Sequence, residues 1–76
     1  MTREAQQQIV FQALIDAGRD EYNARKDAFT ILEAKSELAR FVSLQLAMTT
    51  NKGGRPKPEA VSAVLQRAGF TAEVVS

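Results

Sequence analysis

The chain has 76 residues, neither cysteine nor histidine, and a formal net charge of +1 at pH 7. This composition excludes disulfides and thiolate metal sites, and it removes the commonest metal ligand and the commonest general base near neutral pH. A dedicated nucleic-acid binder of this size carries a much larger positive charge. Because so short a chain rarely obtains more than about 3–5 kcal/mol of stability from its core, we expect self-association or docking on a larger partner.

The sequence has the character of one folded domain. Hydrophobic residues make up 45% of it, which favours a globular fold over disorder. No apolar run approaches the roughly 20 residues of a membrane span. The N-terminus has Glu4 and a glutamine run where a signal peptide has a basic region before its apolar segment. We therefore expect a single helical domain over residues 1–76, located in the cytoplasm.

The first predicted helix covers residues 3–17. Thr2 is a suitable N-cap, and Gly18 suits the left-handed position that follows a helix. Val10 and Leu14 are spaced four residues apart, as the apolar side of a helix requires.

The longest predicted helix covers residues 21–49. Asp20 is a suitable N-cap, and no glycine or proline interrupts the chain before Gly53. At about 100° per residue, the apolar side chains gather into an arc that is wider than a surface helix needs. The members of this arc are Ala24, Ala28, Ile31, Leu32, Leu38, Ala39, Val42 and Leu46, with Phe29 and Phe41 at its margins. We expect a second copy of the helix to cover it, which makes the protein a homodimer.

The predicted interface residues are Ile31, Lys35, Leu38, Val42 and Leu46. Lys35 is the unusual member, because lysine is seldom fully buried. In one interpretation its aliphatic stem lies along the apolar side and its ammonium group reaches solvent. In the other it pairs with a carboxylate at the interface and fixes the register of the two helices. The sequence leaves both interpretations open.

The last predicted helix covers residues 58–68. Pro58 suits its first position, where the missing N–H has no partner within the helix. Gly69 and Phe70 are typical of a Schellman ending, with Phe70 in contact with Leu65. The tail over residues 71–76 is either a short extended segment, which we favour, or a final helical turn.

The elbow predicted over residues 50–57 contains three basic residues. The string GRPKP, which starts at Gly54, resembles the core of the AT-hook and the basic arm before the helix-turn-helix of serine recombinases. That resemblance implies that Arg55, supported by Lys52 and Lys57, binds the narrow minor groove of A·T-rich DNA. It covers five residues, and the AT-hook core has an arginine where this chain has glycine.

The same elbow also has a purely local explanation. Its glycines suit the end of one helix, Pro56 keeps the preceding residue extended, and Pro58 begins the next helix. The basic side chains then remain available to contact an acidic surface of a partner protein.

No catalytic constellation emerges from the sequence. The serines lack a histidine to activate them, the carboxylates are scattered, and the glycine pair lacks the spacing of a phosphate-binding loop. We therefore expect no enzymatic activity, no cofactor and no metal. The predicted fold is all-α, a helical hairpin with a long second helix, a short C-terminal helix and a short tail.

The predicted function is a small non-catalytic protein-interaction module that acts through helix surfaces. A regulator, adaptor or inhibitor of phage or plasmid type fits this description, with the chain itself and another protein as partners. The alternative is a dimeric DNA-binding regulator that places the GRPKP elbow on the DNA backbone or in the minor groove.

Overall fold

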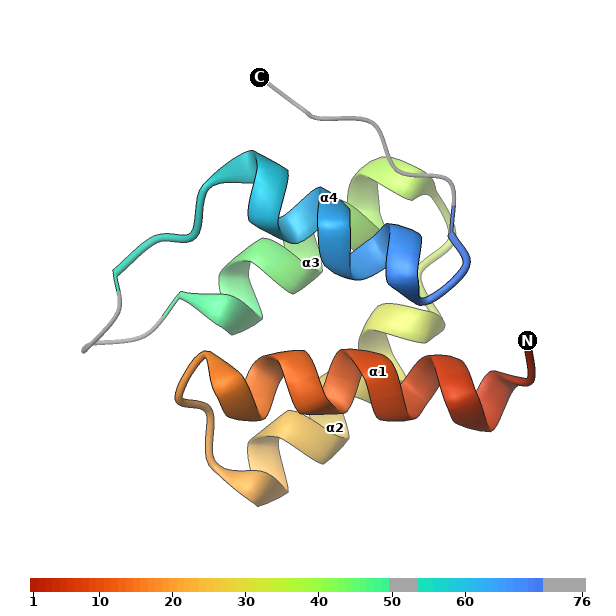
Figure 1. Cartoon of the computed structure of the whole chain (residues 1–76), viewed down its shortest axis with the longest axis horizontal. Coiled ribbons are helices and arrows are strands. Elements are labelled where there is room, and N and C mark those ends of the chain that lie inside the picture. Colours follow the sequence, from red (N-terminus) through yellow and green to blue (C-terminus); the bar gives the residue numbers. More distant parts are fainter. Residues whose placement is uncertain (50–53, 71–76) are drawn as a thin grey trace.

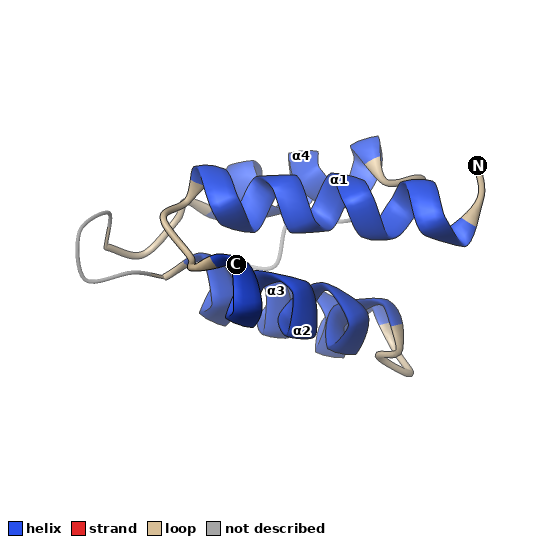
Figure 2. Ribbon diagram, turned by 90° about the horizontal axis from the view of Figure 1, so that it is seen from below, coloured by secondary structure: helices blue, strands red, loops and turns tan. Residues whose placement is uncertain are grey.

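The computed structural model describes residues 1–49 and 54–70. Within these ranges the fold is all-α, as predicted, with four helices: α1 (Arg3–Asp16), α2 (Glu21–Leu32), α3 (Glu37–Met48) and α4 (Pro58–Arg67). They form two layers, α1 with α4 and α2 with α3 (Figures 1 and 2). In the described ranges no helix has the length and hydrophobicity needed to cross a membrane. The predicted tail over residues 71–76 lies outside the described residues.

The predicted ends of the first helix are confirmed. The Thr2 hydroxyl accepts a hydrogen bond from the N–H of Ala5 at 3.1 Å. Gly18 has a φ of 102°, and the N–H of Arg19 donates to the carbonyl of Leu14 at 2.9 Å. Together with the left-handed glycine, this hydrogen bond makes a Schellman ending.

The prediction of one helix over residues 21–49 is wrong. α2 ends at Leu32 and α3 begins at Glu37, so a turn over residues 33–36 separates them. Ser36 adopts an extended conformation at the start of α3, and its hydroxyl accepts a hydrogen bond from the N–H of Ala39 at 3.0 Å. A serine N-cap in an extended conformation is incompatible with a continuous helix through the same position. The break therefore needs neither glycine nor proline.

Arg40 connects this turn to the other end of the chain. Its Nη2 donates to the carbonyl of Ala34 at 3.0 Å, and its guanidinium lies 4.2 Å from the ring centroid of Phe70. Phe70 is held by the predicted Schellman ending of α4, in which its N–H donates to the carbonyl of Leu65 at 2.9 Å and Gly69 has a φ of 85°. One arginine thus links the α2–α3 turn to the residue that follows α4.

The core is one buried cluster to which all four helices contribute. α1 and α3 each contact all three other helices. The buried side chains are Val10, Ala13, Leu14, Ala24, Ala28, Ile31, Leu32, Phe41, Leu44, Ala47, Val61, Val64, Leu65 and Ala68. The apolar side predicted for the first helix is therefore confirmed at Val10 and Leu14, and Leu65 of the last helix is also buried.

Candidate protein-interaction surface

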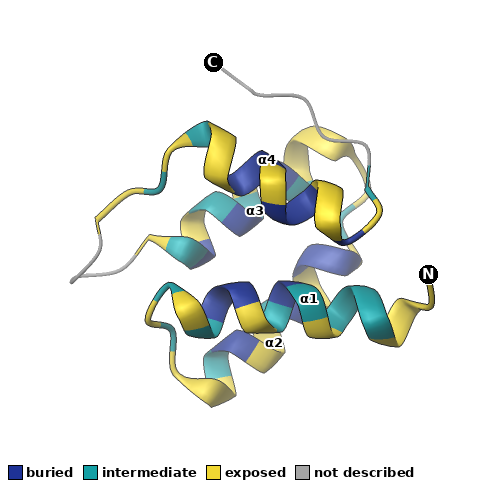
Figure 3. Ribbon diagram, viewed as in Figure 1, coloured by how far each residue is buried: buried dark blue, intermediate teal, exposed yellow. Residues whose placement is uncertain are grey.

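Three large apolar side chains lie exposed on the outer side of α3. Leu38, Val42 and Leu46 are 56%, 42% and 69% exposed. Their spacing of four residues places them on one side of the helix, whereas Phe41, Leu44 and Ala47 are buried. In Figure 3 the ribbon of α3 accordingly carries both buried and exposed colours. Single exposed leucines are ordinary, whereas a contiguous apolar row marks a binding surface or an aggregation hazard. We call Leu38, Val42 and Leu46 the α3 stripe.

The stripe is exposed because the α2–α3 turn changes which side of α3 faces the core. In the predicted continuous helix, Leu38 and Leu46 shared an apolar arc with Ile31, to be covered by a second copy. In the structure the inward residues of α3 are Phe41, Leu44 and Ala47, so of the arc members on α3 only the marginal Phe41 is buried. On α2 the arc members Ala24, Ala28, Ile31 and Leu32 are buried within the chain, whereas the marginal Phe29 is exposed. Coverage of the exposed members by a second copy stays a prediction.

The five predicted interface residues occupy three different environments. Ile31 is 1% exposed, belongs to the core and lines a groove between α2 and α3. Lys35 is exposed in the turn over residues 33–36 rather than on a helix side, so the helical spacing that placed it in the arc does not hold, and its pairing at an interface stays a prediction. Leu38, Val42 and Leu46 stay together as the α3 stripe.

An open groove of about 610 Å³ runs along one flank of the stripe, between α3 and the elbow. Its lining combines an apolar floor, one amide and two cations: Phe41, Val42, Gln45, Arg55, Pro56, Lys57 and Pro58. Arg55 and Lys57 are exposed, and neither forms an ion pair with another described residue. Among the residues that the structure describes, no carboxylate lines this elbow groove. The third predicted basic residue, Lys52, lies outside the described residues.

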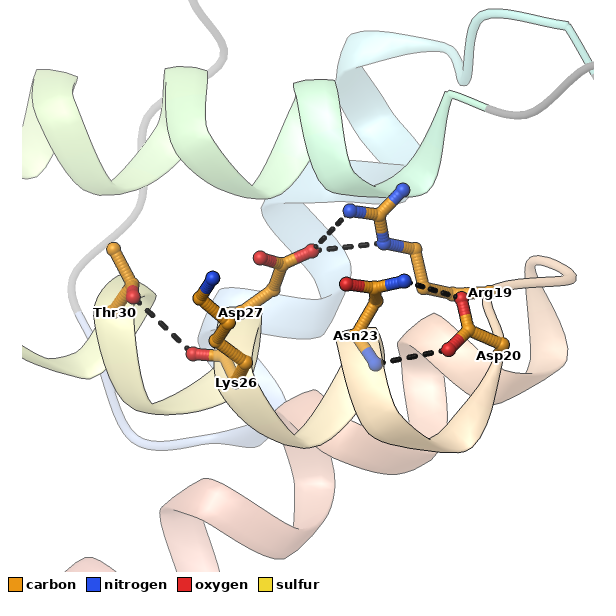
Figure 4. Close-up of polar contacts among 6 residues, drawn as sticks. All are labelled: Arg19, Asp20, Asn23, Lys26, Asp27 and Thr30. Atoms are coloured by element: carbon orange, nitrogen blue, oxygen red, sulfur yellow. Dashed lines mark hydrogen bonds and ion pairs between the residues drawn. The ribbon is translucent and has the colours of Figure 1, made fainter.

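The opposite flank of the stripe has a smaller groove of about 280 Å³ between α2 and α3. Leu46 and Ser43 border it on the α3 side. Its charges are paired with each other, since Nη2 and Nε of Arg19 contact the same carboxylate oxygen of Asp27 at 2.7 and 2.8 Å (Figure 4). The two flanks therefore differ in electrostatics, one with free cations and the other neutralised.

A second exposed apolar patch lies on α2, where Tyr22 and Phe29 are 75% and 53% exposed. Sequence reasoning missed it, although a spacing of seven residues places both rings on one side of a helix. Tyr22 and Phe29 line a surface groove together with Arg25. The charge of Arg25 is already paired, because its guanidinium contacts the carboxylate of Glu21 at 3.0 Å and lies 4.6 Å from the ring centroid of Phe11. Sequence reasoning also missed Gln45 in the elbow groove, whose position three residues after Val42 could have indicated it.

Asp20 is the N-cap of α2, as predicted, and its carboxylate is tied to Asn23. The side-chain amide of Asn23 donates to Oδ1 at 2.7 Å, and the backbone N–H of Asn23 donates to Oδ2 at 3.0 Å (Figure 4). These hydrogen bonds, the side-chain one first, lower the pKa of Asp20 from its ordinary value of 3.8. The folded state therefore favours the ionised carboxylate.

We expect Asp20→Asn to make the stability of the fold less sensitive to acid. The pKa of Asp20 is lower in the folded than in the unfolded chain, so its stabilising effect is complete above 3.8 and disappears as the pH falls through the folded value. Asparagine still caps the helix but does not titrate in this range. Melting temperatures measured from about pH 6 down to about pH 2 should show the wild-type advantage shrinking as acid is added. A constant difference over the whole range would contradict the assignment.

The described residues of the site combine exposed apolar side chains with exposed cations. In residues 1–49 and 54–70, no three acidic side chains gather closely enough to hold a metal ion. The exposed cations border an apolar floor instead of an enclosed cavity with converging polar groups. The chain matches no protein-family model, no curated protein and no solved structure.

Proposed function

We propose that the protein is a small non-catalytic protein-interaction module whose binding surface is the α3 stripe. The observation that supports this proposal is the exposure of Leu38, Val42 and Leu46 in one row on a helix that buries its other side. Covering one such side chain fully is worth about 1.5–3 kcal/mol relative to leaving it in water. A complex in which a partner covers the row is therefore stabilised by the apolar area that each of the three side chains removes from water.

The shape of the surface favours a helical partner. Residues four apart form a ridge on a helix, and helices associate by placing the ridge of one into the groove of another. The stripe is such a ridge, with a groove on either flank. An amphipathic helix with apolar residues three and four apart fits this relief, as in other helix-in-groove complexes.

The homodimer expected from the sequence stays a prediction. Its proposed interface is now the α3 stripe instead of one side of a single long helix. The stripe is an apolar patch of the order of a few hundred Å². A stable complex buries about 800 Å² on each partner. Either a second copy or another protein must therefore contact more than the stripe, which brings the flanking grooves into the interface.

We expect the double variant Leu38→Asp/Leu46→Asp to lose partner binding and any concentration-dependent self-association. Each substitution puts a charge into an apolar contact that the complex would desolvate, so the loss should exceed tenfold. Sedimentation of the purified chain over a range of concentrations reports self-association. Capture from a native lysate treated with nuclease, with wild type and variant compared side by side, reports other proteins.

A matched control adds the same charge elsewhere. Gln8 on α1 and Ala60 on α4 are both exposed and lie outside the stripe. Gln8→Asp/Ala60→Asp should therefore behave like the wild type in both measurements. If the wild type stays monomeric and captures nothing that the stripe variant fails to capture, the proposed function is wrong.

The alternative of DNA binding through the elbow has weaker support. Arg55 and Lys57 are exposed and have no acidic partner among the described residues, as DNA contacts would require. Against this, they border apolar groups that a phosphate backbone would leave uncovered, and the chain has a net charge of only +1.

A further inference from the structure

The two flanks of the stripe differ in charge, and this difference bears on the nature of the partner. We infer that the α3 stripe and the elbow groove together bind an acidic amphipathic helix. The apolar row of that helix lies on the stripe, and its carboxylates lie over Arg55 and Lys57. This inference rests on the proposed function and adds the chemical class of the partner.

Arg55 and Lys57 lie together on the elbow groove, and like Arg40, Arg67, Lys26 and Lys35 they form no ion pair among the described residues. Arg3, Arg19 and Arg25 each have a carboxylate within 3.0 Å. Arg55 and Lys57 have no such partner among the described residues, although they are only two residues apart. A partner that supplies carboxylates here would meet two adjacent cations without breaking an existing ion pair.

Residues 55–58 hold these two cations on a backbone whose dihedral angles are restricted by prolines. Pro56 and Pro58 fix φ at their own positions, and each restricts the residue before it, which is Arg55 in one case and Lys57 in the other. Lys57 is also the N-cap of α4 and has an extended backbone, with φ −68° and ψ 146°. Less backbone freedom is lost on binding when the loop is already restricted.

The floor of the elbow groove favours a protein over DNA. Val42 belongs both to the stripe and to this groove, so the apolar surface continues from one into the other. Pro56 and Pro58 add apolar lining to the groove that holds the cations, and Gln45 contributes an amide. A partner must therefore bring apolar and acidic groups side by side, which an acidic amphipathic helix does and a phosphate backbone does not.

A second copy of the chain fits the same surface less well. An antiparallel two-fold pair centred on Val42 places both elbows at the same edge of the interface, where Arg55 and Lys57 of the two copies repel each other. A parallel pair places each elbow over the α2 flank of the other copy, where Asp27 is already paired with Arg19. Asp27 is the carboxylate that lines the groove on the α2 flank, so neither arrangement brings an unpaired carboxylate from the two described grooves to the elbow.

The test uses a display library of random 16-residue peptides selected on the immobilised full chain. We expect wild type to enrich peptides with leucine-like residues three and four apart and an excess of glutamate and aspartate. Arg55→Glu/Lys57→Glu should bind the selected acidic peptides at least about tenfold more weakly, because two attractions become repulsions. It should itself enrich basic peptides with the same apolar spacing. A fluorescein-labelled 20-base-pair duplex at about 50 mM salt serves as the nucleic-acid probe.

The outcomes separate this inference from the proposed function. Enrichment of apolar peptides without acidic excess, with affinity unchanged by Arg55→Glu/Lys57→Glu, overturns the inference and leaves the stripe as the binding surface. Failure to enrich any peptide, or equal enrichment on Leu38→Asp/Leu46→Asp, overturns both. Duplex binding that is lost in Arg55→Glu/Lys57→Glu, without peptide enrichment, replaces both with the DNA-binding alternative.

Discussion

Leu44→Ala is expected to lower the free energy of unfolding by about 2–5 kcal/mol, and Leu46→Ala by no more than about 0.5 kcal/mol. The two leucines are two residues apart on α3, but Leu44 is 0% exposed in the core and Leu46 is 69% exposed. Truncation of Leu44 removes buried apolar contacts and leaves a cavity, whereas truncation of Leu46 removes atoms already in contact with water. For a chain of this size the first change consumes most of the expected stability.

Urea unfolding followed by circular dichroism measures both values from the same kind of transition. The pair also tests which side of α3 faces the core. The sequence predicts Leu46 at an interface with a second copy, so a large loss at that position would indicate that the side chain is covered in solution. A larger effect at Leu46 than at Leu44 would contradict the fold as described.

The helix ends were the most predictable part of the fold, because they depend on local chemistry. Thr2, Asp20 and Pro58 mark three helix starts, and Gly18 and Gly69 mark two helix ends, all as the sequence indicates. Each acts through hydrogen bonds or dihedral angles within a few residues. Sequence reasoning about such signals needs no knowledge of the remaining fold.

The break between α2 and α3 was less predictable. Ser36 followed by Glu37 is a common helix start, but serine also occurs within helices, so the pair does not force a break. In the structure Arg40 supports the turn through the carbonyl of Ala34 and the ring of Phe70. Phe70 is thirty positions further along the chain, and no local pattern brings it to the turn.

The candidate surface was predicted in its parts but not in its assembly. Leu38, Val42 and Leu46 were grouped by helical spacing, and Arg55 and Lys57 were grouped by the elbow. That Val42 shares a groove with Arg55 and Lys57 depends on how α4 lies across α3 (Figure 1) and on which side of α3 faces the core after the break. Both are consequences of tertiary packing.

We expect Arg40→Ala to lower the free energy of unfolding by about 2 kcal/mol. The substitution removes a charged hydrogen bond to the partly buried carbonyl of Ala34 and a cation–π contact with Phe70. Part of the loss is offset, because the Nε of Arg40 is buried without a hydrogen-bond partner among the described residues. Urea unfolding measures the net effect.

Arg25→Ala is the matched control, because Arg25 also lies over a phenylalanine ring but its side chain is 62% exposed. We expect it to cost no more than about 1 kcal/mol, as exposed ion pairs and cation–π contacts contribute little. A double-mutant cycle of Arg40→Ala with Phe70→Leu isolates the link between the α2–α3 turn and the end of α4. A coupling energy near zero would show that Arg40 acts on the turn alone. A coupling of about 1 kcal/mol would show that Phe70, thirty residues away, helps to hold α3 in the orientation that exposes its stripe.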